Sequence, residues 1–185
     1  MASPVSHIAV ALSIGTCFYR PGMPRRVWAI GALCSVIPDL DVIGFRYGIR
    51  YGDFWGHRGF THSILFALFI ASVALSLSFL GDLRGLSRFS VWMYFVLVTA
   101  SHGLLDAMTD GGLGVAFFSP LDTHRYFLPW RPIAVSPISF RRLFFTSRGL
   151  AVFQSEILWI WVPAALLAVS AWMLRRRSSV SGVGH

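Results

Sequence analysis

The sequence HRGFTHSILFALFIASVALSLSFL, residues 57–80, joins a polar hexapeptide directly to a long apolar run. Residues 63–80 carry no charged side chain, and a membrane-spanning helix needs roughly 20 apolar residues. Ionisable groups are costly at the boundary of a bilayer and are typical of functional sites there. We therefore expect His57, Arg58 and His62 to belong to a site at the end of a membrane-spanning helix.

The composition of the whole chain is that of a membrane protein. Of its 185 residues, 55% are hydrophobic and only 13% are charged, whereas soluble domains carry about 25% charged residues. The net charge is +8, and every basic residue is arginine. These arginines are scattered through the segments between apolar runs. Membrane topology and anionic lipid head groups explain such scatter better than nucleic-acid binding does.

Apolar runs predict an all-α, polytopic membrane protein with about five spans. The runs cover approximately residues 5–19, 27–37, 63–80, 89–108 and 152–174. The first two are shorter than a span normally is, so they are expected to be thin spans or a tucked hairpin. We expect one transmembrane domain, residues 1–177, and a flexible tail, residues 178–185.

The segments between the runs are rich in residues that interrupt helices. Pro38 is expected to end the second run, because proline disfavours a helical conformation in the residue before it. Residues 44–56 are rich in glycine and aromatic side chains, which predicts an interfacial loop. Residues 115–150 contain four prolines and several aromatic side chains. A loop of that length is often functional, and we expect an interfacial cap that forms a lid.

Alternation of the spans is expected to bring most polar residues to one face of the membrane. The candidates on that face are His7, Asp39, Asp41, His57, His62, His102, Asp106 and Asp110. The positive-inside rule weights charges that flank the spans, which places Arg175, Arg176 and Arg177 in the cytoplasm. The polar residues are then expected on the extracytoplasmic face of a prokaryotic inner membrane.

Three of these residues follow one another at intervals of four on the predicted fourth span. His102, Asp106 and Asp110 therefore share one helix face, with neighbouring Cβ atoms about 5–6 Å apart. Zn²⁺ accepts histidine nitrogen and aspartate oxygen at about 2.0–2.2 Å. A polar stripe along a water-filled vestibule, or a hydrogen-bonded histidine–aspartate pair, would give the same pattern.

The hexapeptide needs a bend if both of its histidines are to face one centre. His57 and His62 would point about 140° apart on a regular helix, and Gly59 is expected to break the helix between them. Thr61 is expected to cap the third span. Arg58 has a planar guanidinium group that suits phosphate or carboxylate, so we expect it to hold an anionic substrate. Contact with a lipid phosphate is the alternative for Arg58.

Asp39, Asp41 and His7 have weaker local signals. The two aspartates follow a predicted helix end, where aspartate commonly serves in turns and caps. His7 near the start of the chain has the pattern of an ordinary interfacial residue. These three residues are expected on the same face of the membrane as the other polar residues, which suggests that they take part in the site. A bound cation would offset the free-energy cost of gathering ionisable groups there.

Together these residues resemble those of a known family. The chain has His7, then PDLD at 38–41, HRGFTHS at 57–63 and HGLLD at 102–106. This pattern resembles the YdjM-like membrane-bound metal-dependent hydrolases over about residues 1–140, including WRPI at 130–133. The resemblance implies a bacterial or archaeal membrane hydrolase with a divalent metal. The spacing of His102 and Asp106 is also distantly similar to zinc-dependent phospholipase C, although Glu156, the only glutamate, has no nearby histidine.

The expected function is hydrolysis of a phosphoester in a membrane lipid or other anionic substrate. The attacking water is expected to be activated by one or two divalent metal ions, and Zn²⁺ is the expected metal. The expected ligands are His7, Asp39, His57, His62, His102 and Asp106. Asp41 or Asp110 is expected to be the general base or a further ligand, and Arg58 the substrate contact.

Two other functions stay open. A transporter of metal ions or protons would usually carry its site near the bilayer midplane, whereas these residues lie at helix ends. A membrane scaffold with a structural metal would need the same ligands without turnover. The sequence does not indicate an oligomeric state.

Overall fold

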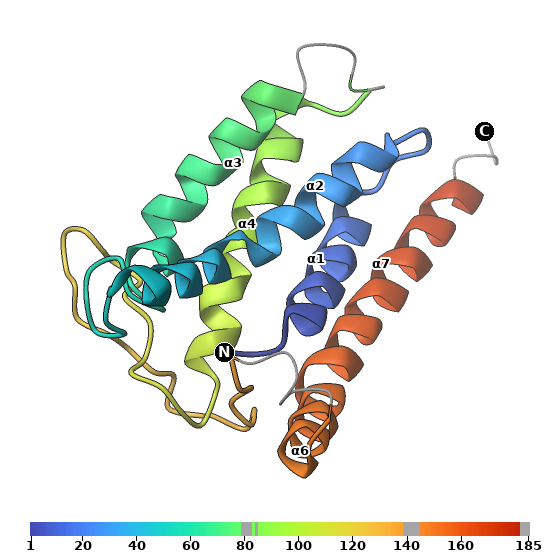
Figure 1. Cartoon of the computed structure of the whole chain (residues 1–185). Helices are drawn as coiled ribbons and strands as arrows, with labels where there is room; N and C mark the ends of the chain where they lie inside the picture. The colour runs from blue at the N-terminus through green and yellow to red at the C-terminus, as the bar shows by residue number, and fades with distance from the viewer. Residues whose placement is uncertain (79–82, 84, 139–144, 182–185) are drawn as a thin grey trace.

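The structure is a computed structural model that describes residues 1–78, 83, 85–138 and 145–181. It confirms the predicted all-α fold: the described residues form no strand, only two isolated bridges. Figure 1 shows the α-helices, which are α1 (Pro4–Phe18), α2 (Arg25–Val36), α3 (Ile64–Ser78), α4 (Arg88–Ala107), α6 (Ser147–Glu156) and α7 (Val162–Ser181). The described residues also form two tighter helices of the 3₁₀ type, η1 (Ile37–Tyr47) and η2 (Phe60–His62), and one wider π-helix, η3 (Ile157–Trp161).

Within the part of the chain that the structure describes, three continuous helical stretches are long and apolar enough to cross a membrane. They are Arg25–Tyr47, Arg88–Ala107 and Ser147–Arg177. The apolar stretches in α1 and α3 are shorter, at Pro4–Phe18 and Ile64–Leu77. Each of the five predicted apolar runs therefore contains a helix within its described residues, and the short first run is confirmed as short.

Helix α4 lies at the centre of the bundle and packs against α1, α2 and α3. Tyr94 is fully buried in α4, and its hydroxyl group donates a hydrogen bond to the carbonyl oxygen of Ala11 in α1 at 3.1 Å. A Cβ atom at Gly31 in α2 would lie only 2.3 Å from the Tyr94 hydroxyl oxygen. The absence of a side chain at Gly31 thus allows α2 to approach α4 closely, which positions the chain that follows α2.

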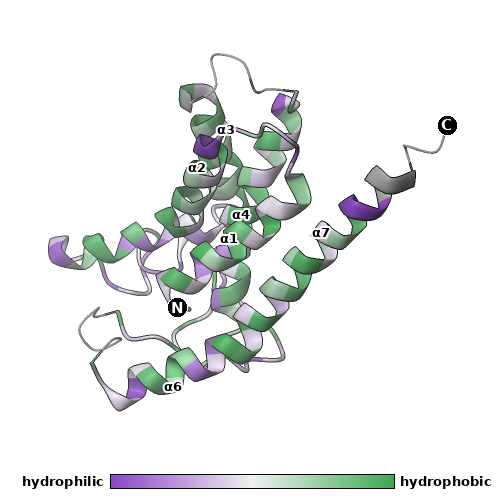
Figure 2. Cartoon of the chain, turned by 90° about the vertical axis from the view of Figure 1, so that its right-hand side faces the viewer, coloured by the Kyte–Doolittle hydropathy of each residue, from purple (hydrophilic) through white to green (hydrophobic). Residues whose placement is uncertain are grey.

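Helix α7 contacts the bundle mainly through α1 and exposes most of its surface. Figure 2 shows that this surface is largely hydrophobic until the polar segment near its C-terminal end. Only 6% of the apolar window in Ser147–Arg177 is buried. A helix that is apolar on all sides is typical of a membrane span, so we expect lipid to cover this surface.

The second run does not end at Pro38, contrary to the prediction. The chain continues through the proline as η1 and ends at Gly48, which has φ 80°. Pro38 stands in the first turn of η1, where its missing N–H group costs no hydrogen bond. Consequently Asp39 and Asp41 lie on helical turns, and the predicted interfacial loop of residues 44–56 is helical up to Tyr47.

The described part of the predicted cap, residues 115–138, is joined to the end of α4 by backbone hydrogen bonds. Ile133 accepts from the N–H group of Asp110 at 2.9 Å and donates to the carbonyl oxygen of Met108 at 3.3 Å. The last helical stretch begins at Ser147, five residues before the predicted start, with Thr146 as its N-cap. Residues 139–144 of the cap and 182–185 of the predicted tail lie outside the described residues, and α7 continues to Ser181.

Candidate metal centre

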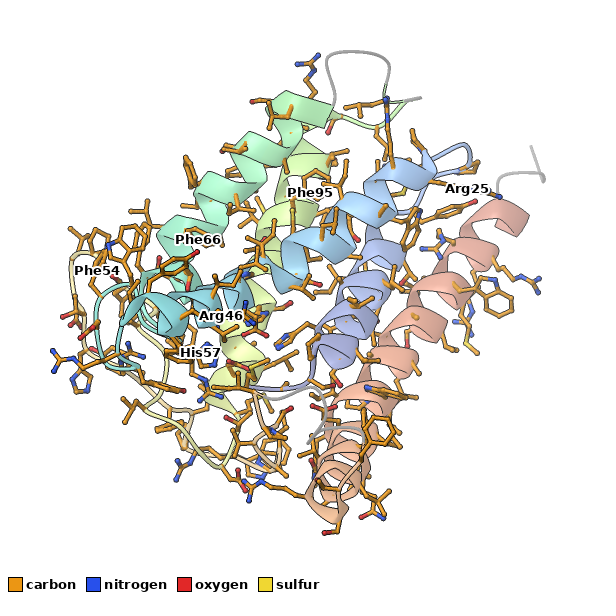
Figure 3. All side chains as sticks on the ribbon, in the orientation of Figure 1. Arg25, Arg46, Phe54, His57, Phe66 and Phe95 are labelled. Carbon is orange, nitrogen blue, oxygen red and sulfur yellow. The ribbon has the colours of Figure 1, made fainter. Side chains whose placement is uncertain are left out.

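One end of the bundle gathers buried histidines and aspartates from five segments. His7 comes from α1, Asp39 and Asp41 from η1, and His62 from η2; His57 precedes η2, and His102 and Asp106 come from α4. Figure 3 shows His57 beside η1 at this end of the molecule. Two overlapping groups could each hold a metal ion, namely Asp39, His62, His102 and Asp106, and Asp41, His57 and His62.

The first group has the spacing of a metal coordination shell. The Nε2 atom of His102 lies 3.2 Å from Asp39 Oδ1 and 3.1 Å from His62 Nε2. His62 Nε2 lies 3.6 Å from Asp106 Oδ2. Ligand atoms bound at about 2.0–2.1 Å to a tetrahedral ion lie about 3.3 Å from one another. The four side chains therefore already surround a point that such an ion would fit.

Several buried atoms of this end of the bundle have no hydrogen-bond partner among the described residues. They include both carboxylate oxygens of Asp39, both ring nitrogens of His7, and Nε2 of His57. His7 Nε2 lies 3.6 Å from Asp106 Oδ1. Buried polar atoms are nearly always satisfied in native proteins. A bound cation would give the Asp39 oxygens a partner. His7, which lies beside Asp106, would be well placed as a further ligand.

The orientation of His102 is set by groups outside the cluster. Its Nδ1 atom lies 2.7 Å from the carbonyl oxygen of Ser35 in α2. The carbonyl can only accept, so Nδ1 carries the proton and the lone pair of Nε2 faces the cluster. This is the usual way in which a second shell fixes the tautomer of a metal-binding histidine. The ring of His7 stacks on the ring of His102 with centroids 3.7 Å apart.

Arg58 is placed differently from the prediction. It is fully buried, and its guanidinium group donates to Asp106 Oδ2 at 3.0 Å, to Thr109 Oγ1 at 2.9 Å and to the carbonyl oxygen of Gly111 at 2.8 Å. Its backbone has φ 66°, a strained conformation for a residue with a side chain. This placement does not fit a substrate clamp: Arg58 orients Asp106 instead.

Asp41 serves as a brace for the hexapeptide. Its Oδ1 atom lies 2.7 Å from His57 Nδ1, and its Oδ2 atom accepts from Thr61 Oγ1 at 2.8 Å and from the Arg58 N–H group at 3.2 Å. Both oxygens are therefore occupied. Because Asp41 holds Nδ1 of His57, the unpartnered Nε2 is the ring atom left for chemistry.

The bend within the hexapeptide is achieved by close backbone packing. A Cβ atom at Gly59 would lie 2.3 Å from the carbonyl oxygen of Phe54, so only glycine fits. Thr61 is not the cap of α3, contrary to the prediction, because its hydroxyl group donates to Asp41. Ser63 takes that place, and its Oγ atom accepts from the N–H group of Phe66 at 3.1 Å.

Asp110 is not brought into either group. Its side chain is exposed, and Oδ1 accepts a hydrogen bond from the backbone N–H group of Val135 at 2.8 Å. Helix α4 ends at Ala107, with Met108 as its C-cap. Asp110 therefore lies beyond the helix and does not share a helix face with Asp106. Asp110 therefore holds the cap against the end of α4.

The charges around the hexapeptide shift the pKa values of its two histidines in opposite directions. Burial alone would lower the pKa of His62, but hydrogen bonds with Asp106, Asp39 and Asp41 raise it to about 10. Burial lowers the pKa of His57 in spite of the Asp41 carboxylate. In the metal-free protein His62 is thus the positive counterion of the carboxylates, a role that a metal ion would take over.

Two further residues escaped the sequence reasoning. Glu156 is fully buried and accepts hydrogen bonds from the hydroxyl groups of Ser3 at 2.6 Å and Ser6 at 2.8 Å, which fixes the start of α1 next to His7. Its signal was a single carboxylate within an apolar run. Arg148 lines a cavity of about 280 Å³ together with His57 and Tyr51. Nothing in the sequence near Arg148 relates it to His57.

A buried centre of histidine and aspartate at one end of a bundle of apolar helices defines a membrane protein with a candidate metal site. The chain belongs to the YdjM family: the family model described as YdjM inner membrane protein matches residues 1–178. It is also 36% identical over 176 residues to Inner membrane protein YbcI of Escherichia coli (strain K12), which covers 95% of this chain and 100% of that relative. No solved structure matches the chain. The predicted family and the inner membrane location are thereby confirmed.

Proposed function

We propose that this protein is a metal-dependent hydrolase that acts on an anionic phosphoester at the membrane boundary. The observation that carries the proposal is the cluster of Asp39, His62, His102 and Asp106, whose ligand atoms lie at coordination distances and include buried oxygens without partners. A divalent ion such as Zn²⁺ would polarise a phosphoryl oxygen and lower the pKa of a water molecule there. His7 would serve as a further ligand.

The chain itself supplies the proton acceptor and the orientation of the ligands. Asp41 fixes the ring of His57 by holding Nδ1, and the unpartnered Nε2 would be the proton acceptor for a group bound in the adjoining cavity. Arg58 holds Asp106, and the carbonyl oxygen of Ser35 holds His102. The second group, Asp41, His57 and His62, would hold a second ion only in place of the hydrogen bonds that Asp41 makes to His57 and Thr61.

The location of the centre favours an extracytoplasmic site and a lipid substrate. His7 stands in the first turns of α1, whereas Arg175 of α7 hydrogen-bonds to the carbonyl oxygen of Thr16 near the other end of α1. The arginines at 175–177 therefore mark the opposite end of the bundle, which the positive-inside rule assigns to the cytoplasm. A centre at the end of apolar helices would lie at the depth of the phosphorylated head groups of membrane lipids.

Turnover with and without metal tests the proposal. We expect the purified, zinc-loaded protein to hydrolyse at least one member of a panel of lipid and soluble phosphoesters. Chelator should abolish the activity, and added Zn²⁺ should restore it. Stoichiometric metal without any turnover would contradict the hydrolase and favour a structural metal. Metal-dependent uptake of the ion into proteoliposomes would instead favour a transporter.

The affinity for metal is expected to rise with pH. His62 has a pKa of about 10 without metal, so it is protonated between pH 6 and 8, and an ion must displace its proton. One released proton lowers the dissociation constant by roughly tenfold for each pH unit. Calorimetric titration with Zn²⁺ at several pH values measures this slope. Asp110→Asn should leave the slope unchanged, and a flat profile in the native protein would exclude His62 as a ligand.

A further inference from the structure

The cavity beside His57 contains a cation that the metal centre does not use. It has a volume of about 280 Å³, and its lining includes Tyr51, His57, Gly112 and Arg148. Among the described residues of this lining, Arg148 is the one charged side chain and none is a carboxylate. Arg148 is exposed and has no hydrogen-bond or ion-pair partner among the residues that the structure describes.

The guanidinium group of Arg58, which is paired with Asp106, lies directly behind the cavity wall. A Cβ atom at Gly112 would lie 2.6 Å from Arg58 Nη1 and 2.7 Å from the Tyr51 hydroxyl oxygen. Gly112 has φ +92°, so a side chain there would be strained as well as crowded. Because Gly112 has no side chain, only a thin backbone layer separates the cavity from the Arg58 guanidinium group.

A third feature of the cavity is an unsatisfied buried nitrogen. His57 is 1% exposed, its Nδ1 atom is held by Asp41, and its Nε2 atom has no partner. Because His57 lines the cavity, this unpartnered nitrogen is the ring atom that would hydrogen-bond to an oxygen of a bound group. The metal cluster begins on the other side of the same ring, where Nδ1 lies 4.0 Å from Asp39 Oδ1.

We propose that this cavity binds the phosphate group of the substrate, with Arg148 as its cation and His57 at its inner end. The inference rests on the proposed function, and it moves the anion contact from Arg58 to Arg148. Arginine suits phosphate because its planar group forms paired, charge-assisted hydrogen bonds. Pockets for drug-sized ligands measure about 300–1,000 Å³. The smaller cavity therefore fits a phosphate with a short head group, while any acyl chains remain outside.

Phosphate binding by purified protein in detergent tests this site independently of turnover. The probes are inorganic phosphate and dihexanoyl phosphatidic acid, a phosphate carried by a short lipid, each titrated calorimetrically into zinc-loaded and into metal-free protein. Arg148→Gln should weaken binding by about tenfold or more, equivalent to about 1.4 kcal/mol, and Arg148→Lys should weaken it less. Because Arg148 is exposed, both variants should fold and keep their metal.

The matched control is Arg46→Gln, which removes an exposed arginine from η1 and should bind like the native protein. Binding of both probes would identify phosphate itself as the ligand, and binding of the lipid alone would identify a lipid head group. An Arg148→Gln protein that binds as tightly as the native one, or a native protein that binds neither probe, would overturn the inference. If Arg148-dependent binding is found but no phosphoester is hydrolysed, the site stands and the proposed hydrolase falls.

Discussion

Replacement of His102 by alanine is expected to remove the bound divalent metal while the protein still inserts and folds. His102 Nε2 is within 3.2 Å of Asp39 and 3.1 Å of His62, so it lies at the middle of the candidate coordination shell. Loss of an outer-shell partner typically lowers metal affinity by 10–100-fold, and loss of a direct ligand should exceed about 100-fold. Elemental analysis of dialysed protein measures the metal that remains.

His62→Ala is expected to behave in the same way, because His62 is the histidine shared by both groups. Asp110→Asn is the control, since that carboxylate bonds to Val135 and lies outside both groups. Wild-type metal content in both histidine variants would refute the metal centre. Loss of metal in the Asp110 variant as well would show that the assay responds to disturbance of the cap.

Arg58→Met is expected to destabilise the protein more than any surface change. It would leave the buried Asp106 carboxylate without its arginine partner and would remove the bonds to Thr109 and Gly111. Breaking a buried ion pair by removal of one member costs about 3–5 kcal/mol. Thermal unfolding in detergent should be measured on metal-free protein, because a bound ion would compensate the charge of the unpaired carboxylate.

The double variant Arg58→Met/Asp106→Leu is expected to recover part of this stability, since it removes both charges together. It should not recover metal binding. Arg50→Met is the matched control: its side chain is 87% exposed, and a surface substitution usually changes stability by about 0.5 kcal/mol or less. An Arg58→Met protein as stable as the native one would contradict the buried pair.

The sequence by itself determined the helical membrane architecture and the histidines and aspartates that form the centre. Length and apolarity of a run are local properties, so the helices at residues 63–80 and 89–108 could be predicted directly. The spacing of His102 and Asp106 placed both on one helix face. Alternation of the spans then indicated that Asp39 and His62 would meet them, and the structure brings these four side chains together.

Only the tertiary structure decided which role each of two chemically identical side chains has. Asp41 and Asp110 are both carboxylates next to helix ends, yet one braces His57 and the other holds Val135. Arg58 donates hydrogen bonds to Thr109 and Gly111, which lie 51 and 53 positions away in the sequence. Arg148 instead lines the cavity beside His57. Such roles depend on contacts between distant segments and on burial. Charge and side-chain type, which are all that a sequence displays, are the same for both arginines, and only the fold leaves one of them free to meet a ligand.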